Sequence, residues 1–188
     1  GSTDRTAAIV DSFDASYVRL IENEQNGGSG TVACNQGIEQ ARGDYIVVLD
    51  ADDEFRPLLV EREAEILTAN TDVDFVYPDY YEQYPDGSQE LVETGADIMQ
   101  TVKVGMMHRA DRLQQFNLYD PGMIFAEYDL LLQYLNAGLT GYHIADPLFV
   151  YHRRRDSQTS DNERVQAGKE ELKQKYGAEA QIRSYNFE

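Results

Sequence analysis

The chain has one cysteine, four lysines and no long apolar run. A single cysteine, Cys34, excludes an internal disulfide and fits a reducing compartment. No window approaches the roughly 18 apolar residues of a spanning helix, and the N-terminus lacks the charged-then-apolar layout of a signal peptide. We therefore expect a soluble, cytoplasmic protein.

Basic residues are scarce relative to acids. The sequence has 34 Asp and Glu against 16 Lys and Arg, a formal net charge of -18. Such a surface repels nucleic acid and anionic membranes, so neither is expected as a partner. The acids are spread along the whole chain, which favours a solvated surface. The composition also resembles that of proteins from salt-loving organisms, where 1 M salt screens charges to within ~3 Å.

Length and pattern indicate one α/β domain. The 188 residues and 41% hydrophobic content suffice for a core. Helices and strands alternate along the sequence, with a hairpin turned by PDGS at residues 85–88. The predicted helices cover residues 6–13, 31–41, 110–116, 127–136 and 160–176, with another starting near Pro57. The predicted strands cover residues 17–21, 45–49, 74–77, 80–84, 89–93, 105–108 and 142–151.

The most informative segment is YIVVLDADDE at residues 45–54. Its apolar half predicts a strand covered on both faces, and its acids follow where a strand reaches the ligand-binding edge of an α/β sheet. Carboxylates packed this closely repel one another unless a cation lies among them. Their hard oxygens suit Mg2+, Mn2+ or Ca2+, so the sequence predicts a metal-dependent site with an anionic ligand.

This region also matches parts of two other motifs. Residues 28–33 match G-x-G-x-x-A, and Asp50 ends the next strand, as in a nicotinamide-dependent oxidoreductase. A polar run separates those glycines from the preceding strand, however, and one acid would suffice for a ribose. The acids also fit part of an EF-hand register, but Phe55 stands where that loop needs glycine.

The ordered motifs resemble family 2 glycosyltransferases, which are inverting, nucleotide-sugar-dependent enzymes with the GT-A fold. The matching segments occur in the family's order over most of the chain. They are GSTDRT at residues 1–6, residues 26–38, ARGDY leading into LDADD at residues 41–53, the hairpin at residues 77–87, EYDL at residues 127–130 and SQT at residues 157–159. The resemblance implies a Rossmann-like mixed, mostly parallel sheet flanked by helices.

The resemblance also implies roles for the acids. Asp52 would bind Mn2+ or Mg2+, and Asp50 would contact the ribose or a metal-bound water. Asp53 would support them, and Asn35 would help to bind the donor. The resemblance implies a nucleotide-sugar donor, with a UDP-sugar favoured. The ion would neutralise the diphosphate that leaves the donor.

The catalytic base implied by the family pattern is Glu127, at a helix start. The sequence departs from the pattern here, because Ala126-Glu127 replaces the usual Glu-Asp. The structural alternative for Glu127 is a capping carboxylate in the first turn of its helix, a role that Asp129 could share. Arg153 and Arg154 lie where the family has a loop over the diphosphate. Guanidinium groups suit phosphate oxygens, so the resemblance implies that these arginines bind the donor. His152 is a further candidate metal ligand.

The resemblance divides the single domain of residues 1–188 into three parts. These are a remaining nucleotide-binding part (1–56), an acceptor-side part (57–159) and a C-terminal helix and tail (160–188). The family's N-terminal strand, helix and strand have no counterpart, which predicts exposed sheet edges and a possible homo-oligomer. The acceptor would be a glycan, lipid or protein, reached at the inner face of the membrane, in cell-surface polysaccharide or glycoprotein synthesis. The alternative is a non-catalytic remnant that serves as a binding or assembly module.

Overall fold

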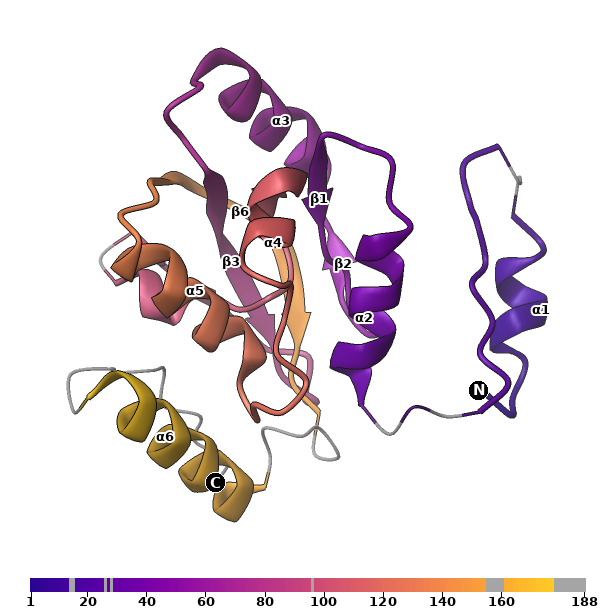
Figure 1. The fold of residues 1–188 in the computed structure, drawn as a ribbon. Coiled ribbons are helices and arrows are strands. Elements are labelled where there is room, and N and C mark those ends of the chain that lie inside the picture. Colours follow the sequence, from indigo (N-terminus) through magenta and orange to yellow (C-terminus); the bar gives the residue numbers. More distant parts are fainter. Residues whose placement is uncertain (14–15, 26, 28, 96, 155–160, 178–188) are drawn as a thin grey trace. The chain divides into compact units, whose positions relative to one another are not determined.

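The computed structural model describes residues 1–13, 16–25, 27, 29–95, 97–154 and 161–177 (Figure 1). The chain forms two compact units, Gly1–Ala41 and Arg42–Glu188. Predicted features at residues 26, 28 and 155–160 lie outside the described residues. No helix in the described ranges is both long and apolar enough to cross a membrane.

The first unit contains helices α1 (Thr6–Val10) and α2 (Gly30–Glu39). The Ser29 hydroxyl caps α2 by accepting a hydrogen bond from Thr31 N at 3.2 Å. The strand predicted at residues 17–21 was wrong, since this segment has no regular structure. Tyr17 is 89% exposed, and no strand in the described part of this unit offers a ladder to pair with.

The second unit is built on a mixed sheet, as the fold class predicted. Its strands are β1 (Tyr45–Val47), β2 (Glu54–Phe55), β3 (Phe75–Gln83), β4 (Gln89–Val92), β5 (Met107–Arg109) and β6 (Gly141–His152). The order is β1-β5-β3-β6-β2, with β4 paired to β3. The expectation of mostly parallel pairing needs correction, because β3–β6 is the one parallel ladder among the described strands. The β3–β4 hairpin enforces antiparallel pairing, and the parallel β3–β6 pair needs the long helical crossover. The other antiparallel ladders join strands that are distant in sequence.

Helices cover both faces of this sheet. They are α3 (Leu59–Ala69), the 3-10 turn η1 (Ile98–Gln100), α4 (Ala110–Gln115), α5 (Ala126–Asn136) and α6 (Asn162–Tyr176). α4 and α5 lie on one side of the strands in Figure 1, and α6 packs beside α5. Helices α3, α4, α5 and α6 agree with the predicted helices, whereas η1 was not predicted.

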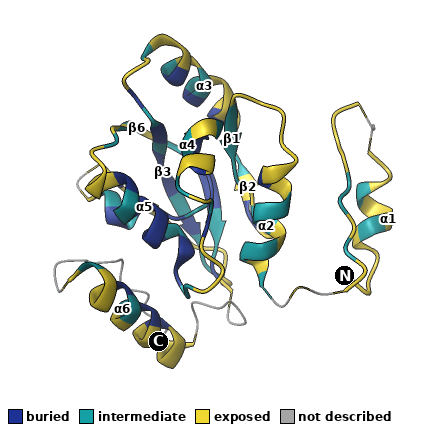
Figure 2. Ribbon diagram, in the orientation of Figure 1, coloured by how far each residue is buried: buried dark blue, intermediate teal, exposed yellow. Residues whose placement is uncertain are grey.

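Side-chain alternation along the strands divides the core into two layers. On one face, Val76 of β3 packs with Leu59 and Leu67 of α3. On the other, Phe75 lies 5.5 Å from the Tyr134 ring of α5, centroid to centroid. Most of β3 and the inner helix faces are buried, whereas β1 is half-buried and the outer helix faces are exposed (Figure 2).

Two buried ionisable groups have no hydrogen-bond partner among the described residues. Burial raises the pKa of Glu63 on α3 to about 9. Burial also lowers the pKa of His108 on β5 to about 3. Both groups are therefore neutral at pH 7.

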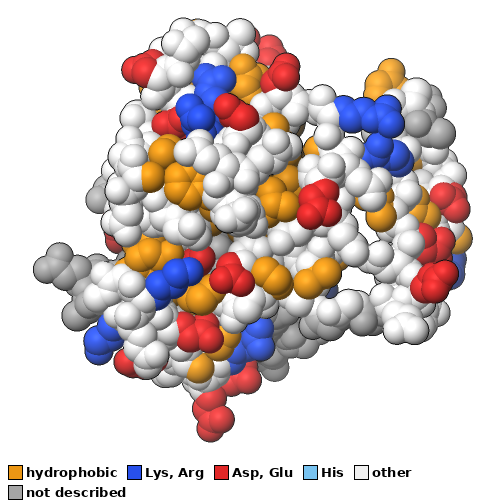
Figure 3. Space-filling model, in the orientation of Figure 1, with side chains coloured by type: hydrophobic (Ala, Val, Ile, Leu, Met, Phe, Trp, Pro, Cys, Tyr) orange, Lys and Arg blue, Asp and Glu red, His pale blue; other side chains and the backbone are white. Residues whose placement is uncertain are grey.

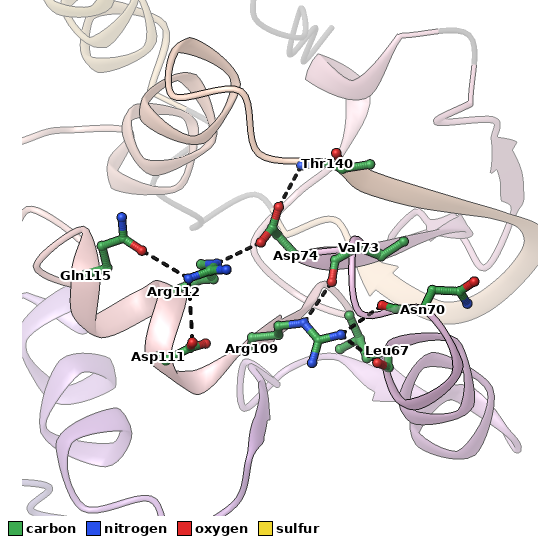
Figure 4. Close-up of polar contacts among 9 residues, drawn as sticks. All are labelled: Leu67, Asn70, Val73, Asp74, Arg109, Asp111, Arg112, Gln115 and Thr140. Carbon is green, nitrogen blue, oxygen red and sulfur yellow. Dashed lines mark hydrogen bonds and ion pairs between the residues drawn. The ribbon is translucent and has the colours of Figure 1, made fainter.

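A network of satisfied polar groups closes the end of the sheet where β3 begins (Figure 4). Arg109 donates to the carbonyls of Val73, Leu67 and Asn70 at 2.8, 2.6 and 2.9 Å. Next to it, Asp74 accepts from Arg112 Nε at 2.7 Å. Arg112 therefore joins α4 to the start of β3.

Candidate active site

Four acids follow β1 at the opposite end of the sheet. After β1, Val48 forms a parallel bridge with Val104, and Asp53 N donates to Asp50 O at 3.1 Å to close a turn. The strand is less covered than predicted: its residues are half-buried and Leu49 is 49% exposed. β1 is therefore an edge strand in the described sheet, and its exposed end carries the acids.

Asp53 is the buried member of the acid cluster. Its Oδ1 accepts a hydrogen bond from His152 N, at the end of β6, at 2.8 Å. Its Oδ2 is buried with no hydrogen-bond partner in the described structure. Burial raises the pKa of Asp53 to about 7; the His152 N–H opposes the shift, and the charges of Asp52 and Asp50 add to it. Asp53 thus links the acid turn to β6.

Asp50 forms an ion pair that the sequence did not predict. Lys103 Nζ lies 2.9 Å from Asp50 Oδ1, and the two side chains are 21% and 41% exposed. Lys103 precedes Val104, which forms a bridge with Val48 just after β1. The backbone therefore places the ammonium of Lys103 beside Asp50, at the end of β1. The scarcity of lysine was the available signal, because Lys103 is the one lysine before residue 169.

The two candidate arginines have different environments. Arg154 Nη1 lies 3.8 Å from Asp52 Oδ2, and both side chains are about half exposed. Arg153 is buried instead, with Nη1 3.6 Å from Glu82 Oε1 on β3. Successive residues of an extended chain point to opposite sides, so Arg154 is the one beside the acids.

His152 lies near the acids without bonding to them through its ring. Its Nδ1 is 3.9 Å from Asp53 Oδ1, and its Nε2 is 3.9 Å from Glu54 Oε1. Both distances exceed a hydrogen bond. His152 therefore holds Asp53 through its backbone N–H, and its imidazole lies beside the acids without a direct hydrogen bond to them.

The acid cluster suits a cation that is coordinated partly by the protein and partly by a bound ligand. Nowhere in the described ranges do three His, Cys, Asp or Glu side chains converge as a ready-made metal site. Asp50 and Asp52 nevertheless provide accessible hard oxygens, and Asp53 Oδ2 is a buried oxygen without a partner. Mg2+ is commonly held by one or two carboxylates, waters and substrate phosphates, and this donor set suits that arrangement.

Glu127 belongs to the same electrostatic cluster. It lies in the first turn of α5 and lines a small cavity with Lys103 and His108. Burial raises the pKa of Glu127; its own backbone N–H and Lys103 oppose the shift, and Asp50 adds to it. A carboxylate with a raised pKa is a stronger proton acceptor. The arrangement can therefore support general base catalysis beside the acids.

Asp129 has a structural position rather than a place in this cluster. Its carboxylate accepts from Tyr176 Oη at 2.7 Å and from Gln133 Nε2 at 2.9 Å, and Lys175 Nζ lies 2.7 Å away. The side chain is fully buried. Asp129 therefore anchors α6 to α5.

Asn35 lies in the first unit, half-buried on α2. That unit has an open cleft of about 680 Å3, lined by Gly1, Ser2 and the polar segment that precedes α2. Asn23 Nδ2 donates to Gln36 Oε1 at 2.7 Å beside it. The volume of this cleft is in the range of small-molecule sites.

The sequence profile of glycosyl transferase family 2 matches residues 1–126. This match spans more than half of the chain and includes β1 and the acid turn. The chain therefore belongs to glycosyl transferase family 2.

Several relatives are glycosyltransferases. A glycosyltransferase of Haemophilus influenzae is 26% identical over 89% of this chain and 62% of its own length. Glycosyltransferase GlyG of Streptococcus pneumoniae is 34% identical over 52% of this chain and 33% of its own length. The succinoglycan biosynthesis protein ExoO of Rhizobium meliloti is 42% identical over 38% of this chain and 23% of its own length.

The fold agrees with that of a solved structure. Staphylococcus aureus TarS, residues 1–349, superposes with a TM-score of 0.66 at 16% identity, over 92% of this chain and 54% of the TarS chain. The GT-A fold class predicted from the sequence is thus confirmed. The chain spans 54% of the solved TarS chain and 62% of the length of the Haemophilus relative.

Proposed function

We propose that this chain transfers a sugar from a nucleotide-sugar donor to a glycan acceptor, with inversion at the anomeric carbon. The observation that carries the proposal is the cluster on one unit of accessible carboxylates (Asp50 and Asp52), a guanidinium (Arg154) and a half-buried carboxylate (Glu127). Membership of family 2 supports a nucleotide-sugar donor. The relative ExoO, named for succinoglycan biosynthesis, supports a polysaccharide acceptor.

Asp50 and Asp52 would hold the divalent ion, Mn2+ or Mg2+, together with the donor. When bound, that ion would stabilise the negative charge that develops on the leaving diphosphate. Arg154 lies beside Asp52, where its guanidinium can donate to phosphate oxygens. Asp53 would position the acid turn through its bond to β6. We favour a UDP-sugar, as the family resemblance implies.

Glu127 would remove the proton from the acceptor hydroxyl. The hydroxyl oxygen then forms its bond to the anomeric carbon on the face opposite the diphosphate, and the bond to the diphosphate oxygen breaks. The products are the glycoside with inverted configuration and a nucleoside diphosphate. A base with a raised pKa suits this step, because it retains the proton after transfer.

Release of nucleoside diphosphate from a panel of UDP-sugars, with Mn2+ and polysaccharide fragments as acceptors, tests this function. We expect release that is lost in Asp52→Ala and kept in Asp72→Ala, an exposed acid outside the cluster. NMR of the product should show the inverted anomer. Metal-independent UDP binding without turnover would instead favour a non-catalytic binding module.

A further inference from the structure

Lys103 is held by a rigid backbone beside the acid turn. Gly105 N donates to Val48 O at 3.2 Å, and Tyr128 Oη donates to Thr101 O at 3.0 Å. The flanking residues Val102 and Val104 are buried. The main chain around Lys103 is therefore fixed on both sides, and the movable part is the side chain that ends at Asp50.

The charge of Lys103 reaches three carboxylates. It pairs with Asp50 at 2.9 Å, and it stabilises the charged forms of Asp53 and Glu127. Since Lys103 is only 21% exposed, solvent screens this interaction less than it screens a surface pair. The ammonium thus occupies the position at Asp50 where a divalent cation would find an oxygen ligand.

We propose that Lys103 is an intramolecular competitor of the divalent cation for Asp50, so that the metal binds tightly only together with the donor. This inference rests on the proposed function. A metal that binds alone must displace the ammonium of Lys103 from Asp50 and then lie beside it, where the two positive charges repel each other. A nucleoside diphosphate brings negative charge that offsets this repulsion, so donor and metal favour each other's binding.

The coupling between the two ligands is the measurable consequence. Coupling is reciprocal, so the factor by which UDP tightens Mn2+ binding equals the factor by which Mn2+ tightens UDP binding. Removing the ammonium should strengthen Mn2+ binding in the absence of UDP. The same change should reduce the coupling factor, because the competition has gone.

Calorimetric titration with Mn2+ alone, and then with Mn2+ in saturating UDP, tests the proposal on wild type, Lys103→Met and Lys173→Met. Lys173 is an exposed lysine on α6 that lies beside Glu170, so its loss changes the net charge equally without removing the ion pair at Asp50. We expect Lys103→Met to bind Mn2+ alone about tenfold more tightly than wild type, with a smaller coupling factor. Lys173→Met should match wild type.

Lys103→Arg keeps the positive charge and should keep the wild-type Mn2+ affinity. Lys103→Gln is a second neutral variant, to be used with Lys103→Arg if Lys103→Met is unstable. If both neutral variants bind Mn2+ no more tightly than Lys173→Met, the competition is overturned while the proposed function stands. If wild type binds Mn2+ neither alone nor with UDP, the donor site itself is wrong, and this inference falls with it.

Discussion

Two polar clusters lie at opposite ends of the sheet and differ in how far their polar atoms find hydrogen-bond partners. At the start of β3, Arg109 donates to three carbonyls and Asp74 bonds to Arg112 (Figure 4). Beyond the end of β1, Asp53 Oδ2 has no hydrogen-bond partner among the described residues. Satisfied charges stabilise a fold, whereas charges left in excess at an accessible edge indicate a ligand.

Surface charge alone does not distinguish the acid cluster after β1 from the rest of the molecule. Acidic, basic and hydrophobic side chains are interspersed over the face in Figure 3, and the formal net charge is -18. An excess of acid is therefore common to the whole sequence. The site is identified by the position of its acids at the carboxyl end of β1, where α/β sheets bind ligands.

The largest expected effect is on turnover. Glu127→Gln keeps the shape of the side chain and removes its basicity, so we expect kcat to fall by about 10³-fold, with UDP binding unchanged. Nucleoside diphosphate release measures the first and calorimetry the second. A variant with near wild-type kcat would show that another group takes the proton.

A second variant concerns a buried carboxyl with no partner among the described residues. The pKa of Glu63 is raised from its ordinary 4.5 to about 9, so its contribution to stability is complete below pH 4.5 and is lost as the pH rises towards 9. Glu63→Gln cannot ionise, so we expect it to be more stable than wild type by about 3 kcal/mol at pH 7. Urea unfolding at pH 4.5 and 7 measures this difference. An equal difference at both pH values would mean that the carboxyl does not ionise on unfolding.

The satisfied cluster is tested by Arg109→Ala. This change leaves three carbonyls without their donor, and we expect a loss of about 2 to 3 kcal/mol in the free energy of unfolding. UDP and Mn2+ affinities should not change in the folded variant. A large loss of affinity without a loss of stability would reverse the roles that we give to the two clusters.

The smallest effect is expected at Arg154. Arg154→Ala removes a half-exposed guanidinium beside Asp52, and UDP binding should weaken about tenfold. Arg153→Ala is the matched variant, and it should lower stability because Arg153 is buried against Glu82. Equal effects of the two changes on UDP affinity would contradict the separation seen in the structure.

Local patterns predicted most of the second unit. The PDGS turn marked the β3–β4 hairpin, and the apolar spacing after Pro57 marked α3. The segment at residues 17–21 failed because alternation indicates a strand only where another strand pairs with it. Strand direction in the sheet was also beyond local patterns, since β5 and β2 pair with strands that are distant in sequence.

The site was predictable only in part for a similar reason. The D-x-D acids and Glu127 stand in recognisable motifs. The Lys103–Asp50 pair, however, joins two loops through the bridge between Val48 and Val104, and no local pattern indicates it. Likewise, adjacent arginines look alike in sequence, and only the packing of β6 against β3 decides that Arg153 is the buried one.

The most direct test of a donor site at the acid end of β1 is calorimetry with UDP and Mn2+ on wild type, Asp52→Ala and Arg112→Ala. We predict Mn2+-dependent UDP binding to wild type and to folded Arg112→Ala, and its loss in Asp52→Ala. Metal-dependent binding that survives in Asp52→Ala would contradict the assignment of the site to this edge of the sheet.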